Sequence, residues 1–127
     1  MPALQNTVLT DRAGTPVNHT FVPQNVVQGV GTVVESTGVP VGNSRLSVSL
    51  RKTETGRFKS TVQLAVPVLV NEVINGVSQP KVVRTAYANA TFTFDETSSL
   101  QERKDLIGMF QSSLDPSKLL VNDTVIG

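Results

Sequence analysis

Polar side chains recur at every second position along three stretches of the chain. They are Arg45, Ser47, Ser49, Arg51 and Thr53, then Lys59, Thr61, Gln63 and Ala65, and then Thr85, Tyr87, Asn89, Thr91 and Thr93, with Ala65 as the one apolar member. If the stretches are strands, each set lies on one face of a sheet, because side chains alternate between faces. In proteins that recognise single-stranded nucleic acid, hydroxyl and amide groups form hydrogen bonds with the edges of bases. An aromatic ring stacks on a base, and Arg or Lys binds phosphate. The pattern therefore indicates a surface for a single nucleic-acid strand.

A less specific interpretation also fits these positions. One face of an antiparallel sheet is commonly solvated, and such a face is rich in Thr and Ser. The surface has three cations and no Asp or Glu, although the chain has ten acidic residues, but the formal net charge of +1 predicts no polyanionic partner by itself. Both interpretations stay open on these residues alone.

Composition argues against most catalytic functions. The chain has no Cys and one His, so it lacks a thiolate nucleophile, a disulfide framework and a histidine-rich metal site. We expect His19 to be a side chain of the surface or of an N-terminal hairpin. The same composition argues against a small hydrolase, and we predict no enzyme, no cofactor, no metal and no small-molecule substrate. The chain shows neither a membrane-spanning run nor a signal peptide, so we expect synthesis in a cytoplasm and no membrane partner.

The elements that would position these residues are mostly strands, because 21 Val and 14 Thr favour a pleated surface. Turn residues and alternation predict strands at 4–10 and 17–23, which form an N-terminal hairpin, and at 30–36, 45–53, 58–68 and 82–94. The stretches 45–53 and 58–68 should pair with each other. The segment from Asn71 to Pro80, which contains Asn75 and Gly76, is expected to be a loop.

The pattern changes to a helical period near the C-terminus. Apolar residues at 100, 106, 107, 110 and 114 fall on one stripe, and either Ser98 with Gln101 or Ser99 with Glu102 offers a capping box. This predicts a helix over 99–113. Asp115 followed by Pro116 predicts a second, short helix over 116–121. The fold class is therefore α+β, with one domain over 1–127 that consists of a hairpin (1–23), a sheet (30–94) and helices (99–122).

The opposite face of the sheet is apolar, and we expect helices to cover it. It carries Leu46, Val48 and Leu50, then Val62, Leu64 and Val66, and then Ala86, Ala88, Ala90, Phe92 and Phe94. One short sheet offers a small apolar area to Leu100, Ile107, Phe110 and Leu114. We therefore predict that these four residues form a dimer interface and that folding and dimerisation are one transition.

The order of elements and several motifs resemble the coat proteins of single-stranded RNA bacteriophages, the leviviruses. The stretch 84–94 (RTAYANATFTF) is similar to the final strand of that family, with its Tyr, an Asn or Asp two residues later, and a Thr-Phe-x-Phe ending. The stretch 47–51 (SVSLR) resembles the family's Thr-x-Ser-x-Arg strand, and 61–67 (TVQLAVP) resembles its Thr-x-Lys-x-Glu-x-Pro strand. The resemblance spans nearly the whole chain.

This resemblance implies a fold and a function. Family members form dimers in which two C-terminal helices interlock across the partner's sheet, and the dimers tile an icosahedral shell. The open face of the paired sheet binds the genomic RNA and, in many members, an RNA hairpin, which represses translation. The chain would then be a virion protein that is made in the cytoplasm of a bacterial host. Its partners would be a second copy of itself and single-stranded phage RNA.

The resemblance also implies roles for single residues. Tyr87 would stack on an unpaired base and Asn89 would bond nearby sugar or base atoms. An adenine pocket would be lined by Ser47, Ser49, Thr61 and Gln63 and closed by Val30, phosphates would be held by Arg45, Arg51 and Lys59, and Thr85 and Thr91 complete the RNA-binding face. The loop with Asn71, Asn75, Gly76 and Pro80 would lie at the symmetry axes of the shell.

Two departures from the family pattern affect these expectations. Gln63 stands where some members have Lys, which removes one charge from the pocket, and the absence of Cys excludes the disulfide-linked loops of some members. An alternative from another class is a β-rich pilus or adhesin subunit that does not bind RNA, against which the lack of a signal peptide argues.

Overall fold

Six strands and two α-helices follow one another in the computed structural model, which describes residues 3–36, 38 and 40–127. The strands are β1 (Thr7–Thr10), β2 (Asn18–Val27), β3 (Val30–Glu35), β4 (Ser44–Lys52), β5 (Phe58–Ile74) and β6 (Val77–Phe94), with a 3-10 turn at Pro40–Gly42 before β4. The helices are α1 (Leu100–Ser113) and α2 (Leu119–Ile126). The chain divides into a sheet unit up to Thr93 and a helical unit from Phe94 to Gly127, and each is described by itself.

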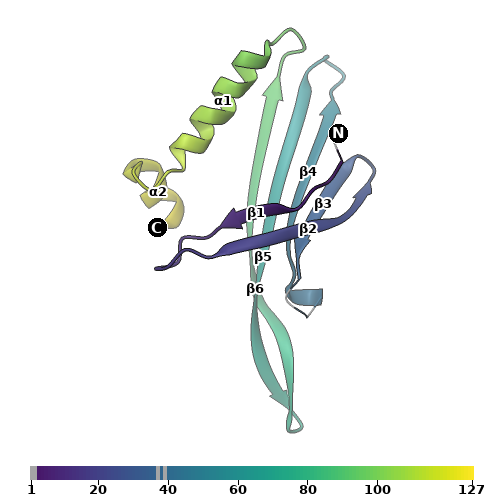
Figure 1. Cartoon of the computed structure of the whole chain (residues 1–127), viewed down its shortest axis with the longest axis vertical. Helices are drawn as coiled ribbons and strands as arrows, with labels where there is room; N and C mark the ends of the chain where they lie inside the picture. Colours follow the sequence, from purple (N-terminus) through teal and green to yellow (C-terminus); the bar gives the residue numbers. More distant parts are fainter. Residues whose placement is uncertain (1–2, 37, 39) are drawn as a thin grey trace. The chain divides into compact units, whose positions relative to one another are not determined.

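The strands form one antiparallel sheet in chain order, from β1 to β6 (Figure 1). Each strand therefore pairs with the strand next to it in the sequence, as short turns between β-branched runs favour. The predicted α+β class, the N-terminal hairpin and the pairing of the two central strands are confirmed.

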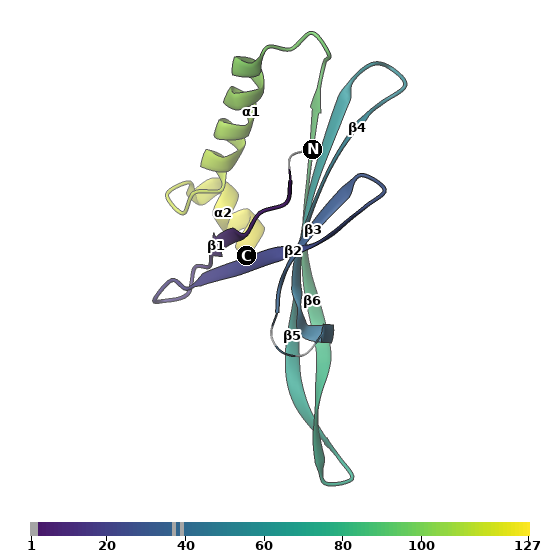
Figure 2. The same ribbon diagram turned by 45° about the vertical axis from the view of Figure 1, so that its right-hand side comes forward.

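The N-terminal hairpin is β1 with the first part of β2, in a register from Thr7↔Phe21 to Thr10↔Asn18. Asp11 fixes the turn, since one carboxylate oxygen accepts hydrogen bonds from the backbone N–H groups of Ala13 (3.1 Å) and Val17 (2.9 Å). The second part of β2 leaves β1 and pairs with β3. The hairpin accordingly crosses the direction of the longer strands (Figure 2).

The expected loop between Asn71 and Pro80 is wrong. β5 continues to Ile74, β6 begins at Val77, and only Asn75 and Gly76 connect them. Both connecting residues have positive φ (51° and 77°), as a two-residue type I′ hairpin turn requires, and Asn-Gly is the strongest sequence signal for that turn. Pro80 lies within β6, at the edge of the sheet, where the missing N–H of a proline is tolerated. The two strands thus extend past the others as a two-stranded arm (Figure 1).

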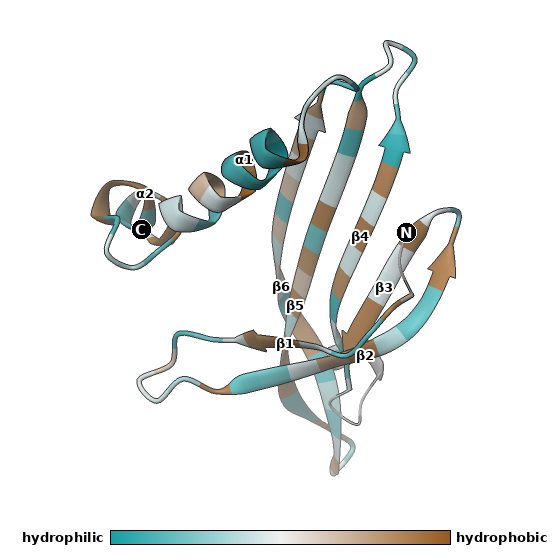
Figure 3. Cartoon of the chain, turned by 45° about the horizontal axis from the view of Figure 1, so that its top comes forward, coloured by the Kyte–Doolittle hydropathy of each residue, from teal (hydrophilic) through white to brown (hydrophobic). Residues whose placement is uncertain are grey.

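The buried apolar residues of the described chain gather where β2 meets β3. Phe21, Val33 and Val34 are 3%, 6% and 8% exposed. The face that was expected to be covered is less buried, since Leu50 is 55% and Val66 39% exposed. Hydrophobic and hydrophilic bands alternate along the strands (Figure 3), so the stretches with a period of two lie in strands, where alternate side chains point to opposite faces.

The helical unit begins as predicted and ends differently. Ser99 caps α1, because its hydroxyl accepts a hydrogen bond from the Glu102 N–H at 3.2 Å. The second helix starts at Leu119 rather than at 116 and runs to Ile126. Asp115 does not cap it, because its carboxylate accepts from the N–H and the hydroxyl of Ser117 (3.0 and 2.8 Å) and holds a separate turn. Neither α-helix is long and apolar enough to cross a membrane.

Candidate nucleic-acid interface

The ladder between β4 and β5 places the predicted polar residues directly opposite one another. The pairs are Arg45↔Ala65, Ser47↔Gln63, Ser49↔Thr61 and Arg51↔Lys59. Residues opposite each other in an antiparallel ladder share a face. The prediction that these side chains form one surface is therefore confirmed for both strands.

β3 adds two residues to the same surface. Val30 lies opposite Ser49, as the sequence prediction requires, and Thr32 lies opposite Ser47. The Thr32 and Ser47 hydroxyl oxygens are 3.4 Å apart, at the outer limit of a hydrogen bond. Thr32 is not among the residues predicted above, although it follows Val30 by two residues and so shares its face.

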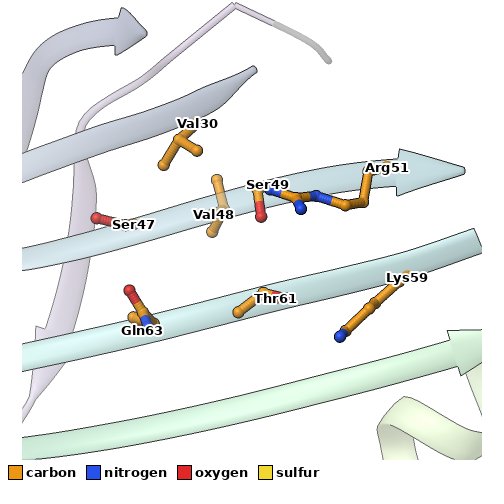
Figure 4. Close-up of a pocket in the computed structure, with 8 residues that line it drawn as sticks. All are labelled: Val30, Ser47, Val48, Ser49, Arg51, Lys59, Thr61 and Gln63. Carbon is orange, nitrogen blue, oxygen red and sulfur yellow. The ribbon is translucent and has the colours of Figure 1, made fainter. Parts of the chain in front are cut away.

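Seven of the predicted residues surround one hollow in this surface (Figure 4). Its lining residues are Val30, Ser47, Val48, Ser49, Arg51, Lys59, Thr61 and Gln63. Ser47 and Gln63 lie at one end, Ser49 and Thr61 in the middle, and Arg51 and Lys59 at the other end. The hollow thus offers hydroxyl and amide groups beside two positive charges.

The two cations of the hollow are a like-charged cross-strand pair. Arg51 and Lys59 are directly opposite each other and exposed, and neither has a carboxylate partner in the part of the chain that the structure describes. Like charges in this position destabilise a sheet. An anion held between them would remove that repulsion, which makes this end of the hollow suited to a phosphate group.

The remaining predicted RNA-binding residues lie outside the hollow. Arg45 shares its face through the pair with Ala65. Thr85, Tyr87, Asn89 and Thr91 alternate along β6, which lies next to β5 in the sheet, and Tyr87 is 75% exposed. A ring this exposed is available to stack on a base.

The predicted dimer residues lie along α1 and its C-cap. Leu100, Ile107, Phe110 and Leu114 are 59%, 38%, 43% and 39% exposed. Of the residues predicted for the shell axes, Asn75 and Gly76 form the tip of the arm, and Asn71 and Pro80 lie in its two strands.

Comparisons with known proteins identify the family. The model of the levivirus coat protein family matches residues 2–127. The chain belongs to the levivirus coat proteins. It is 50% identical over 123 residues to the capsid protein of Pseudomonas phage PRR1, which covers 97% of this chain and 94% of that protein.

Solved structures of bacteriophage capsids and particles agree with this assignment. The capsid protein of bacteriophage GA matches with a TM-score of 0.80 and 25% identity, over 95% of each chain. A virus-like particle of bacteriophage NT-214 matches with a TM-score of 0.83 and 26% identity, over 98% of this chain and 96% of that one. The resemblance that the motifs indicated is thereby confirmed, and the family assignment argues against a pilus or adhesin subunit. It also makes the protein structural rather than catalytic.

Proposed function

We propose that this virion protein forms homodimers that assemble into an icosahedral shell around single-stranded phage RNA. The open face of the paired sheet binds that RNA. A hairpin in the RNA is bound there with the highest affinity, and this binding represses translation. The protein is synthesised in the cytoplasm of a bacterial host and remains in the virion.

The hollow between β3 and β5 is the observation that carries the proposal. Arg51 and Lys59 bind phosphates, and Ser47, Ser49 and Thr61 bond the edges of one base. The chemistry matches single-strand recognition, in which splayed bases are stacked and bonded along their edges while cations hold the backbone. Gln63 contributes an uncharged amide. The affinity of this hollow for RNA should therefore depend less on salt concentration than it would with a Lys at position 63.

Tyr87 and Asn89 extend the binding face onto β6. Tyr87 stacks on an unpaired base of the hairpin loop, and Asn89 bonds sugar or base atoms beside it. Their spacing of two residues puts both side chains on one face of the strand. Arg45, Thr85 and Thr91 provide further polar contacts at the edges of this face.

The apolar surface that one chain leaves accessible supports the proposed dimer. Leu100 and Ile107 on α1 and Leu50 and Val66 on the sheet are each at least 38% exposed. A second copy whose helices lie across this sheet face removes both surfaces from water, at about 25 cal/mol per Å² of apolar area. The structure of NT-214, described as a virus-like particle, supports the further assembly of such dimers.

Expression in bacteria, followed by nuclease treatment and sedimentation, tests the proposal. We expect particles by electron microscopy and nuclease-resistant absorbance at 260 nm that sediments with the protein. RNA-free monomers under native conditions would contradict both assembly and packaging. Empty particles would contradict packaging alone.

A further inference from the structure

His19 lies between two carboxylates that come from different elements of the sheet unit. Its Nε2 is 2.7 Å from Asp11 Oδ2, and its Nδ1 is 2.7 Å from Glu35 Oε2. His19 belongs to β2, Asp11 follows β1, and Glu35 is the last residue of β3. The side chain of His19 is 36% exposed, so protons from solvent reach the ring.

Both contacts can be hydrogen bonds only when the ring is protonated. A neutral imidazole has one N–H donor and one bare nitrogen, whereas a carboxylate oxygen only accepts. A neutral ring would therefore place a bare nitrogen 2.7 Å from one of the two carboxylates. The imidazolium donates to both.

The charges that act on the ring agree with this geometry. Hydrogen bonds to Asp11 and then Glu35 raise the pKa of His19 above its usual 6.5. The hydrogen bond from His19, followed by those from the backbone of Val17 and Ala13, lowers the pKa of Asp11 to about 2. Asp11, His19 and Glu35 line a second hollow, separate from the one at Ser49 and Thr61. Its other described lining residues carry no titratable side chain: they are Leu9, Thr10, Phe21, Gly42, Ser44, Leu64, Val66 and Pro67.

The contact to Glu35 lies beyond the end of a strand ladder. The pairing of β2 with β3 runs from Val27↔Val30 to Val22↔Val34, and the part of β2 that contains His19 pairs with β1. The N-terminal hairpin is thus tied to β3 at this level by a side-chain contact instead of backbone hydrogen bonds.

We propose that His19 is a proton-operated clamp, which as an imidazolium ties the N-terminal hairpin to the end of β3 and which loses one of its two ties on deprotonation. The pKa of His19 is higher in the folded chain than in the unfolded chain. Its contribution to stability is therefore complete below pH 6.5 and is lost as the pH rises through the folded value. The lowered pKa of Asp11 has the opposite sign, so its contribution is present above pH 3.8 and is lost as the pH falls towards about 2. Both contributions are complete between pH 3.8 and pH 6.5, and the clamp is closed over that range.

Deuterium exchange at the C2 position of the imidazole, followed by mass spectrometry from pH 5 to 9, measures the protonation of His19 in the native protein. The chain has one histidine, so the signal has one source. We expect a midpoint above 6.5. A midpoint at or below 6.5 overturns the clamp.

Two matched variants test the partner. Glu35→Gln removes one charge at the ring, whereas Glu54→Gln removes one charge in the turn between β4 and β5. We expect the midpoint to move towards 6.5 in Glu35→Gln and to stay at the parent value in Glu54→Gln. An unchanged midpoint in Glu35→Gln contradicts the tie to β3.

Backbone amide exchange over residues 7–20 measures the release itself. After correction for the intrinsic rate, we expect this segment of the parent protein to exchange faster at pH 9 than at pH 6. Equal corrected rates in the parent contradict the release, and this measurement does not depend on whether a variant folds.

Discussion

The β4–β5 hairpin presents a row of polar side chains, and helix α1 presents a stripe of apolar ones. The two surfaces differ in whether a single chain completes them. In the hairpin, each polar residue of the hollow has its neighbours fixed by the ladder, as Ser49 has in Thr61. In α1, Leu100 and Ile107 are 59% and 38% exposed in the single chain. The hairpin therefore completes a surface within one chain, whereas the helix presents apolar area that a second chain can bury.

This difference separates the two parts of the proposed function. Substitutions on the polar face should change RNA binding and leave the protein folded, because strand pairing does not depend on those side chains. Substitutions on the stripe of α1 should remove the folded protein, because the proposed dimer buries that stripe as it folds.

Ile107→Asp should abolish the folded dimer and yield unfolded or aggregated protein, since a charge without a partner would be buried in the stripe. Sedimentation and circular dichroism measure this. Ser112→Asp is the matched control, because it places the same charge about 140° around the helix. A soluble Ile107→Asp monomer that unfolds cooperatively, at a temperature independent of protein concentration, would contradict obligate dimerisation.

Shortening the arm should alter the shell and spare the dimer. Deleting Val73, Ile74, Val77 and Ser78 removes two residues from each strand, which keeps the Asn75–Gly76 turn and the alternation of faces. We expect a change in particle diameter or yield, measured by electron microscopy and sedimentation. The double variant Val73→Thr with Val77→Thr keeps the length of the arm and should assemble as the parent does. Particles of unchanged diameter and yield after the deletion would contradict the prediction that the arm lies at the symmetry axes of the shell.

Tyr87→Ala should weaken binding of the best selected RNA hairpin by roughly 1 to 3 kcal/mol, about 5- to 150-fold, because it removes one base stack. The dimer should remain intact, since the ring is 75% exposed. Tyr87→Phe keeps the stacking ring and should retain most of the affinity in a filter-binding titration. Equal affinity of Tyr87→Ala and parent would place Tyr87 outside the site.

Arg51→Ala and Lys59→Ala should each lower affinity for all RNAs alike. Loss of one phosphate contact to single-stranded RNA should reduce the slope of log K against log salt by about 0.7. Lys52→Ala removes the same charge from a position on the other face, next to Phe58, and should leave the slope unchanged. A loss confined to one RNA sequence would assign these cations to base recognition instead of phosphate binding.

Most of the polar face could be predicted from the sequence, because it depends only on local features of the chain. Alternation and one short turn set the pairs from Arg45↔Ala65 to Arg51↔Lys59. Local turn propensity does not predict the arm, because Pro80 favours a loop in sequence terms, whereas an edge strand tolerates its missing N–H. The start of the second helix was missed because Asp115 can cap a helix or close a turn, and its side chain does the latter.

The surroundings of His19 could not be predicted from the sequence. The irregular step in β2 between Pro23 and Asn25 changes the register with β3, and so no count along the chain brings His19 to Glu35. The position of Thr32, in contrast, is predictable from the sequence, because Thr32 lies on the same face as Val30. The structure adds only that Thr32 pairs with Ser47.

Thr32→Val should have the smallest effect, because it removes one hydroxyl and keeps the β-branched shape. A neutral hydrogen bond contributes roughly 0.5 to 1.5 kcal/mol, so we expect about a two- to tenfold loss of hairpin affinity if the hydroxyl contacts RNA. Thermal stability should hardly change, since the contact to Ser47 is long at 3.4 Å. Thr20→Val, in the N-terminal hairpin opposite Val8, is the matched control and should bind as the parent does. Full affinity of the Thr32→Val protein would show that the Thr32 hydroxyl does not contact RNA. The hydrogen-bonding part of the RNA site would then lie on β4, β5 and β6 alone.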